Sequence, residues 1–330
     1  MALTVGALRL LDGLSPLETL ARVVLCGMGA IGTEILGYLL KRSHEVVGVV
    51  DTDPQKIGRT VAELTGMPIA VRVSGSIKEA PIDNAEVAIF CTKSRISELV
   101  DDITYAATRG VDVVTTSEEM AYPLYAGASF VPALDKIAVD NQVTIVGVGV
   151  NPGFVMDLVP ALVSMATKSP TSIHVVRSVD VSRRRRQLQA KTGVGHTRAK
   201  FDKEMEEGVI GHVGLVESAH LIALSLGKPL EGLKHDVFPV VGSEDYVMGV
   251  RQFAEGRAGN CRIRLDLEMS MTSADFDVVE VKGDPEIKLR FEKGVFGDSA
   301  TVALTVHAAE RVARARAGLI TVLDLPISGS

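Results

Sequence analysis

Three glycines within residues 27–32 have the spacing that binds the phosphates of a dinucleotide. The segment Gly27-Met28-Gly29-Ala30-Ile31-Gly32 matches the pattern G-x-G-x-x-G. The first glycine permits a tight turn out of a strand, the second lets the backbone approach a pyrophosphate, and the third allows a helix to pack closely on the sheet. The N-terminus of that helix directs N–H groups and a partial positive charge at the phosphates. We therefore expect residues 27–32 to bind a nicotinamide cofactor.

An acidic residue follows at the distance that dinucleotide-binding units require. The apolar run 45–50 ends at Asp51, about 20 residues after Gly32. A carboxylate at this place accepts hydrogen bonds from the ribose 2′-OH of NAD and repels the 2′-phosphate of NADP. Lys56 and Arg59 follow closely in the chain and soften that choice. The sequence therefore predicts NAD or NADP as the cofactor, with NAD favoured.

Two adjacent carboxylates, Glu118 and Glu119, follow the apolar run 111–116. If the chain stays extended they face opposite ways, so that one faces a cleft and the other caps the next segment. The alternative is that both cap the start of a helix, where carboxylates are favoured. Thr92 and Thr116, at the ends of two expected strands, are the other polar residues expected beside the cofactor.

The segment Asn151-Pro152-Gly153-Phe154 follows a strand and precedes an apolar helix over 155–166. Proline and glycine fix a turn and leave backbone N–H groups free. We expect Asn151 and Pro152 beside the cofactor ring and Phe154 beside the substrate. A rigid hinge between two domains is the alternative.

Four consecutive arginines occupy residues 183–186. Charge runs usually face solvent, but at the exit of an inward-facing strand Arg183 or Arg184 can bind a substrate carboxylate bidentately. Arg177, earlier on the same strand, is a weaker candidate. If all of them face outward, the pocket takes an amine with an uncharged tail. The histidines, His212 among them, have no metal-ligand spacing and read as surface or packed residues, and no C-x-x-C occurs, so no metal site is expected.

Strand and helix patterns alternate in the first half of the chain. In a parallel sheet built this way, the candidate residues that follow the strands lie at one edge, where the carboxyl ends of the strands meet. Strands are expected over 23–26, 45–50, 70–73, 86–92, 111–116 and 143–148, and helices over 57–64, 96–109 and 132–141. Such alternation predicts an α/β fold with a doubly wound parallel sheet, a Rossmann domain, whose ligands lie at the carboxyl ends of the strands.

The pattern changes after Asn151. Strands with alternating apolar residues are expected over 173–182, 262–272, 276–281 and 287–291, and helices over 204–223 and 300–317. One polar face per strand predicts an open, mostly antiparallel sheet in an α+β domain. We thus expect an extension over 1–19, a dinucleotide-binding domain over 20–150, a substrate and dimerisation domain over 151–300, and a C-terminal helix over 301–330 that returns to the first domain. The exposed sheet face predicts a homodimer.

Composition excludes several classes of protein. With 330 residues, 46% hydrophobic residues and a net charge of −6, the chain is long enough for two domains and too acidic for broad nucleic-acid binding. No apolar run approaches the roughly 20 residues of a membrane span, and the N-terminus does not resemble a signal peptide. Three cysteines without a pairing pattern favour a reduced, cytoplasmic protein.

Five motifs together resemble one enzyme family: G-M-G-A-I-G, D-T-D-P-Q-K-I-G-R, T-T-S-E-E-M-A-Y-P, G-V-N-P-G-F-V-M-D and G-H-V-G-L-V-E-S. The chain is similar to 2,4-diaminopentanoate dehydrogenase and the native amine dehydrogenases, and both resemble dihydrodipicolinate reductase in architecture. The resemblance spans roughly residues 20–325. The glycine pattern alone is less specific than the other motifs.

The resemblance implies NAD(P)-dependent oxidative deamination of an amine or diamino acid to a ketone and ammonia, and the reverse reductive amination. The family's catalytic carboxylate falls within Glu118–Glu119, and Glu118 is favoured as the first residue past the strand's small polar end. A bound ammonium must lose a proton before its carbon is oxidised, and the resulting iminium is cationic. An ionised glutamate serves both needs.

Two other functions compete with this one. A reductase of cyclic imines would have a basic, histidine-rich motif in the second domain, where only His196 follows Lys191. A nucleotide-binding protein without activity is disfavoured by the glutamate pair and the complete glycine pattern. Reduction of NAD or NADP by an amine separates the dehydrogenase from both.

Overall fold

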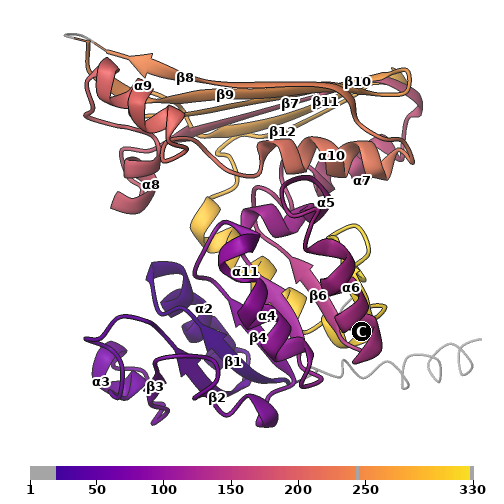
Figure 1. Cartoon of the computed structure of the whole chain (residues 1–330). Coiled ribbons are helices and arrows are strands. Elements are labelled where there is room, and N and C mark those ends of the chain that lie inside the picture. The colour runs from indigo at the N-terminus through magenta and orange to yellow at the C-terminus, as the bar shows by residue number, and fades with distance from the viewer. Residues whose placement is uncertain (1–19, 243–244, 328–330) are drawn as a thin grey trace, which may run out of the picture.

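The computed structural model describes residues 20–242 and 245–327, which form two parts, each built on one sheet (Figure 1). The predicted extension 1–19 lies outside the described residues. The first part holds a seven-stranded parallel sheet in the order β13-β6-β5-β4-β1-β2-β3. Its strands are β1 (Arg22–Cys26), β2 (Glu45–Val50), β3 (Val73–Ser74), β4 (Val87–Phe90), β5 (Asp112–Thr115), β6 (Thr144–Gly147) and β13 (Gly318–Ile320).

Strand β4 is apolar along its length, and β1 and β6 carry a polar residue only at their first position, because helices cover both faces of this sheet. Every residue of β4 and β6 is buried, as is all of β1 after Arg22. The α-helices of this part are α2 (Ala30–Lys41), α3 (Val61–Thr65), α4 (Val100–Ala107), α5 (Pro123–Ala126), α6 (Val131–Asp140) and α11 (Gly297–Ala309). Short 3₁₀ turns are η1 (Ile82–Asn84), η2 (Ile96–Glu98), η3 (Glu118–Ala121) and η5 (Val312–Arg314). The predicted doubly wound parallel sheet is confirmed.

The second part is a six-stranded sheet in the order β12-β11-β7-β10-β9-β8. Its strands are β7 (Lys168–Asp180), β8 (Glu231–Val241), β9 (Val247–Ala258), β10 (Cys261–Ser270), β11 (Phe276–Asp284) and β12 (Ile287–Phe291). All neighbours are antiparallel except β7 and β10, so the sheet is mixed, and the predicted open, mostly antiparallel sheet is confirmed. Strands β8 and β9 were not predicted from the sequence.

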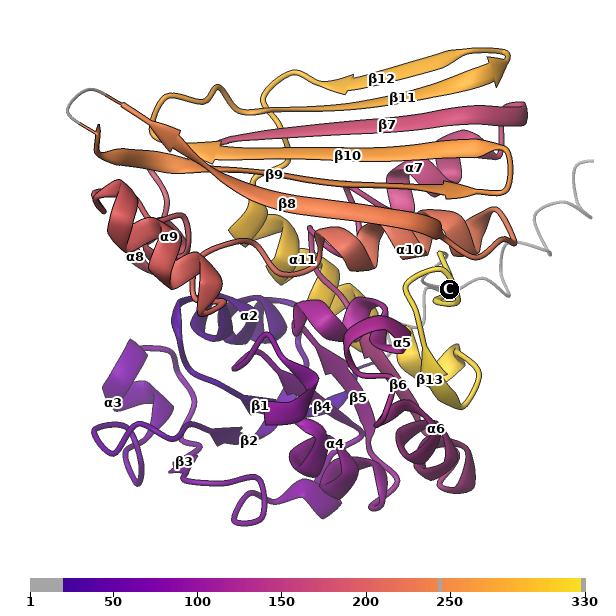
Figure 2. The ribbon, with the colours of Figure 1, turned by 45° about the horizontal axis from the view of Figure 1, so that its top comes forward.

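Helices of the second part lie between its sheet and the nucleotide-binding part. They are α7 (Leu158–Ser164), α8 (Arg186–Lys191), α9 (Arg198–Glu206) and α10 (Leu215–Ser225). Figure 2 shows α7 and α10 under one face of the sheet and α8 and α9 at one end of it. Along β10, Ile263, Leu265 and Leu267 are buried toward these helices, and the intervening side chains lie on the other face, which no described element covers.

Two sequence expectations need correction. The single helix expected over 204–223 is wrong, because the chain leaves the helix after Glu206 and starts α10 at Leu215. Gly208, Gly211 and Gly214 have φ values of 69°, 120° and 112°, which a continuing helix does not allow. The C-terminal segment also contributes more than a helix, since β13 extends the parallel sheet beside β6.

No helix in the described part of the chain is both long enough and apolar enough to cross a membrane.

Candidate active site

The glycine turn has the geometry that a dinucleotide requires. Gly27 has φ +104°, and Gly29 is the N-cap of α2. A Cβ at Gly32 would lie 1.8 Å from the carbonyl oxygen of Gly27, so only glycine allows α2 to pack this closely on β1. A Cβ at Gly29 would meet no atom within 4 Å. The turn is thus closed against the sheet and open toward the cavity, where a pyrophosphate would meet the helix N-terminus.

Asp51 follows β2 beside this turn and is already hydrogen-bonded. Its Oδ2 accepts from the backbone N of Met28 at 2.8 Å and from Lys56 Nζ at 2.9 Å, and its Oδ1 accepts from the backbone N of Asp53 at 2.9 Å. Partial burial opposes ionisation, but the hydrogen bonds from Lys56, Asp53 and Met28 outweigh it and hold the pKa of Asp51 below its usual value. The expected carboxylate is therefore ionised and carries a lysine partner.

A cavity of about 330 Å³ opens between the two parts of the molecule. Ten of the residues predicted for the site line it: Gly29, Ala30, Ile31, Thr92, Thr116, Glu118, Asn151, Pro152, Arg177 and Arg184. The other predicted residues do not line it: Gly27, Met28, Gly32, Asp51, Glu119, Phe154 and Arg183. Gly27 to Gly32 and Asp51 still belong to the phosphate turn and the end of β2, whereas Phe154 packs against the core of the second part and Arg183 is exposed.

The two glutamates face different surroundings. Glu118 lines the cavity, its side chain is 21% exposed, and its Oε1 lies 3.6 Å from Lys191 Nζ. Glu119 turns away, and its Oε2 accepts a 2.8 Å hydrogen bond from the backbone N of Ile96 at the start of η2. The structure thus separates the two roles that the sequence left open, with one carboxylate in the cleft and one capping a turn.

The Asn151–Pro152 segment forms one wall of the cavity. Gly153 N donates to Asp157 Oδ2 at 2.8 Å, and Ser218 Oγ donates to the same oxygen at 2.7 Å. Burial raises the pKa of the fully buried Asp157, against these hydrogen bonds. The network ties the wall to α10. Asn151 Oδ1 is buried and has no hydrogen-bond partner in the described chain.

The cationic side chains of the cavity are paired. Arg177 donates from Nη1 to Asp277 Oδ1 at 2.7 Å and from Nη2 to the carbonyl oxygen of Val295 at 2.9 Å. Arg184 donates to Asp275 Oδ1 at 3.0 Å and stacks on the Phe296 ring. Each lining cation has a carboxylate partner, in the pairs Lys93–Glu98, Arg177–Asp277, Arg184–Asp275, Arg185–Asp298 and Lys191–Glu118.

Sequence reasoning missed three residues near Glu118. Lys191 ends α8 and reaches both Glu118 and Ser94, whose Oγ lies 3.2 Å from Lys191 Nζ. His212 lines the cavity and was expected to be a surface or packed residue. Glu217 on α10 is 4% exposed, and burial, with repulsion from Glu119 and Glu118, raises its pKa to about 7. Gly211 and Gly214 flank His212 and have positive φ values, and these glycines are the feature of the sequence that could have indicated a turn there.

The fold and the glycine turn define a two-domain, dinucleotide-binding dehydrogenase. The model of the 2,4-diaminopentanoate dehydrogenase C-terminal domain matches residues 154–330, and a TrkA-N domain model matches residues 23–108. The chain belongs to the 2,4-diaminopentanoate dehydrogenase family.

One curated protein and several solved structures are similar to the chain, and the solved structures bear on its fold. The chain is 28% identical to 2,4-diaminopentanoate dehydrogenase of Acetoanaerobium sticklandii, with 93% of each chain covered. It superposes on an amine dehydrogenase from Mycobacterium smegmatis with a TM-score of 0.83 at 22% identity, covering 93% of this chain and 96% of that one. A WlbA dehydrogenase from Thermus thermophilus, in complex with NAD and alpha-ketoglutarate, superposes with a TM-score of 0.58 at 11% identity and 90% coverage of both chains.

Proposed function

We propose that the protein is an NAD(P)-dependent amine dehydrogenase that oxidises a primary amine to a ketone and ammonia and catalyses the reverse reductive amination. One observation carries the proposal: Glu118 and the open side of the glycine turn line the same cavity. Family membership and the relatives named above, one of which is called an amine dehydrogenase, support it.

A bound nicotinamide cofactor would supply the hydride acceptor for the substrate's amine-bearing carbon. Glu118 is placed to do the rest of the chemistry at its carboxylate oxygens. It accepts a proton from the substrate ammonium and passes that proton to solvent. The carboxylate is then negatively charged again and stabilises the cationic iminium. The same carboxylate then takes a proton from the water that attacks the iminium carbon and returns it to the nitrogen of the resulting carbinolamine. The C–N bond breaks, the hydroxyl loses its proton, and ketone and ammonia leave. Thr92, Thr116 and the Asn151–Pro152 wall close the cavity around these steps.

We propose that the substrate ammonium displaces Lys191 from Glu118. Lys191 Nζ occupies the position near Glu118 that a substrate ammonium would take, at 3.6 Å from Oε1. Since the Lys191 side chain is 46% exposed, the pair is worth at most about 1 kcal/mol and yields readily. When a substrate ammonium takes the place of Lys191 beside Glu118, Lys191 becomes a cation of the cavity lining that has lost its carboxylate partner. We propose that Lys191, rather than Arg183 or Arg184, meets an anionic group on substrates that carry one.

A panel assay tests these proposals. Purified protein is mixed with simple amines or with amino and diamino acids, each with NAD and with NADP, and reduced cofactor is followed by absorbance. We expect reduced cofactor with at least one amine. A Lys191→Met variant is expected to lose preference for acidic substrates and to keep simple amines. No cofactor reduction across the panel would exclude the function.

We propose that NAD is the preferred cofactor, since the ionised Asp51 lies at the end of β2 beside the glycine turn. Lys56, bonded to that carboxylate, reduces the repulsion that a 2′-phosphate would meet. The preference is therefore expected to be moderate. The ratio of kcat/KM for the two cofactors measures it.

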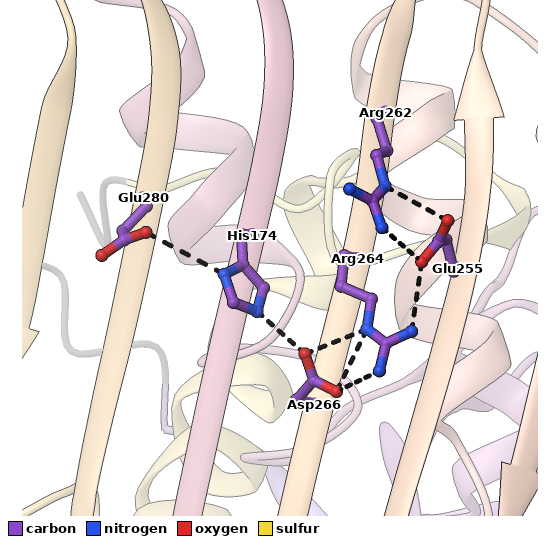
Figure 3. A network of polar contacts seen from close by, with 6 residues as sticks. All are labelled: His174, Glu255, Arg262, Arg264, Asp266 and Glu280. Atoms are coloured by element: carbon purple, nitrogen blue, oxygen red, sulfur yellow. Dashed lines mark hydrogen bonds and ion pairs between the residues drawn. The ribbon is translucent and has the colours of Figure 1, made fainter.

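We also propose that two copies associate through the uncovered face of the second sheet. Figure 3 shows side chains of both signs across this face, namely His174, Glu255, Arg262, Arg264, Asp266 and Glu280. Phe238, 46% exposed, stacks on Phe253 beside them. A face with alternating charges and an exposed ring can pair with its own copy about a two-fold axis. Light scattering is expected to show a dimer, and a Phe238→Asp variant a monomer.

The cysteines Cys26, Cys91 and Cys261 are free thiols in the structure. We propose a cytoplasmic location, which such a set favours. Fractionation of cells that express the protein tests it.

A further inference from the structure

Two polar atoms on the cavity wall are buried without partners. They are Asn151 Oδ1 and His212 Nε2, and neither has a hydrogen-bond partner in the described chain. Leaving such an atom unpaired is unfavourable, so native structures seldom keep one without a use. Both residues line the cavity that holds Glu118. A ligand bound in this cavity is therefore the partner that we consider for each atom.

The His212 main chain is fixed from both sides. Its backbone N donates to Gln252 Oε1 at 2.6 Å, and Gln252 Nε2 donates back to the His212 carbonyl oxygen at 3.2 Å. Gln252 is buried in β9. Such a paired contact sets the position of the His212 backbone relative to the second sheet.

The turn after His212 ties the same segment to Glu118. A Cβ at Gly214 would lie 2.2 Å from Pro152 Cδ and 3.4 Å from Glu118 Cβ. Gly214 therefore lets three segments meet: the Asn151–Pro152 wall, the start of η3 at Glu118, and the loop that carries His212. His212 and Glu118 both line the cavity.

The imidazole is neutral at physiological pH. Burial, together with the charges of Lys191 and Arg177, lowers the pKa of His212 to about 4, against the opposing effects of Glu118 and of a hydrogen bond with the Asn151 backbone. A neutral imidazole has one donor nitrogen and one acceptor nitrogen. Nε2 is the ring nitrogen that has no hydrogen-bond partner in the described chain.

We propose that His212 binds the nitrogen of the substrate amine. Its Nε2 accepts a hydrogen bond from one N–H group of that nitrogen, while Glu118 takes the proton that must leave. This role rests on the proposed function. The balance is simple: one proton passes from the ammonium to a Glu118 oxygen, and no bond to His212 forms or breaks. The neutral amine keeps an N–H directed at Nε2, which holds its new lone pair toward Glu118.

Asn151 provides the contrast. Its Oδ1, which has no hydrogen-bond partner in the described chain, belongs to the wall that we assign to the cofactor ring. Substitution of Asn151 is therefore expected to change the affinity for the cofactor. The experiment compares His212→Leu, His212→Gln and Asn151→Ala with the wild type. It measures the amine KM and kcat by cofactor reduction, the dissociation constant of the oxidised cofactor by calorimetry, and the melting temperature.

His212→Leu is expected to raise the amine KM at least tenfold, because the substrate binds first as an ammonium and the variant loses a hydrogen bond from that charged donor. The cofactor dissociation constant is expected to stay within twofold. His212→Gln, whose amide oxygen reaches the place of Nε2, is expected to restore the KM to within about threefold, because it recovers that hydrogen bond. Asn151→Ala is expected to weaken the cofactor instead. A structural role alone would not divide the effects in this way.

A wild-type measurement keeps the test valid if a variant unfolds. In ¹⁵N-histidine-labelled protein with oxidised cofactor, added amine is expected to shift the Nε2 resonance that is missing from His212→Gln. An unshifted resonance, or a folded His212→Leu with the wild-type amine KM, overturns the role of His212 alone. Equal changes in amine KM and cofactor affinity also overturn it. A wild type that oxidises no amine overturns the proposed function, and this role with it.

Discussion

Glu118→Gln is the perturbation that tests the mechanism most directly. Glutamine keeps the size of the side chain and removes both the base and the charge. Loss of a general base costs about 10²–10⁴ in rate. A unit charge about 4 Å from a cationic intermediate is worth about 4 kcal/mol at the effective dielectric of a partly exposed site, an upper figure here because Glu118 is 21% exposed. We therefore expect kcat to fall by at least two orders of magnitude.

The controls for this variant come from the structure. The ion pair with Lys191 is exposed, so the melting temperature should change by no more than a few degrees. The cofactor dissociation constant should stay within twofold, because the phosphates are expected at Gly27–Gly32. Glu119→Gln is the matched variant: its amide oxygen can still accept from Ile96 N, so its kcat should fall by less than about threefold.

Steady-state kinetics at saturating amine and cofactor give both values of kcat. Near-wild-type turnover in Glu118→Gln, with a collapse in Glu119→Gln, would move the catalytic role to Glu119. Full activity in both variants would refute the reasoning that a carboxylate accepts the proton of the substrate.

Three further predictions concern the cofactor and stability. Asp51→Ala frees the Lys56 ammonium for a 2′-phosphate, so kcat/KM for NADP relative to NAD should rise at least tenfold; strong NADP preference in the wild type would contradict this. Gly32→Ala should lower the melting temperature, whereas Gly29→Ala, which meets no atom within 4 Å, should keep it and lose only cofactor affinity, as calorimetry would show. The pKa of Glu217 is raised to about 7 in the folded protein, so the stability that its protonated form contributes is fully present below pH 4.5 and is lost as pH rises through 7. The free energy of unfolding of Glu217→Gln should therefore rise relative to that of the wild type by on the order of 3 kcal/mol between pH 5 and pH 8, as measured by denaturant titration. A difference between the two proteins that does not change with pH would refute this.

Local patterns sufficed for the first part of the molecule. The buried strands β1, β2, β4, β5 and β6 are continuous apolar runs, and the glycine turn has a fixed spacing, so both could be read from the sequence. The carboxyl-end rule for parallel sheets then placed Glu118 near the cavity. Whether Glu118 or Glu119 faces it depends on the hydrogen bond from Ile96 N, a contact with η2 that no local pattern contains.

The second part was harder because its features depend on distant partners. Strand β8 has mostly exposed or half-exposed residues and belongs to the sheet through its ladder with β9. The break between α9 and α10 follows from glycines with positive φ, which a search for helical spacing overlooks. His212 was misjudged for a related reason: its surroundings come from Asn151, Glu118 and Gln252, which lie 40 or more residues away in the chain.

Strand β13 has a consequence for synthesis. The parallel sheet receives its edge strand from residues 318–320, whereas its other strands end by residue 147. During synthesis, the nucleotide-binding part is therefore incomplete while about 150 intervening residues emerge from the ribosome and form the second sheet. In this period the outer edge of β6 is unpaired, and the surface that α11 later covers is exposed. The order of emergence makes the second sheet the first unit to be complete, and premature release of the chain would leave an open, apolar sheet edge available to chaperones.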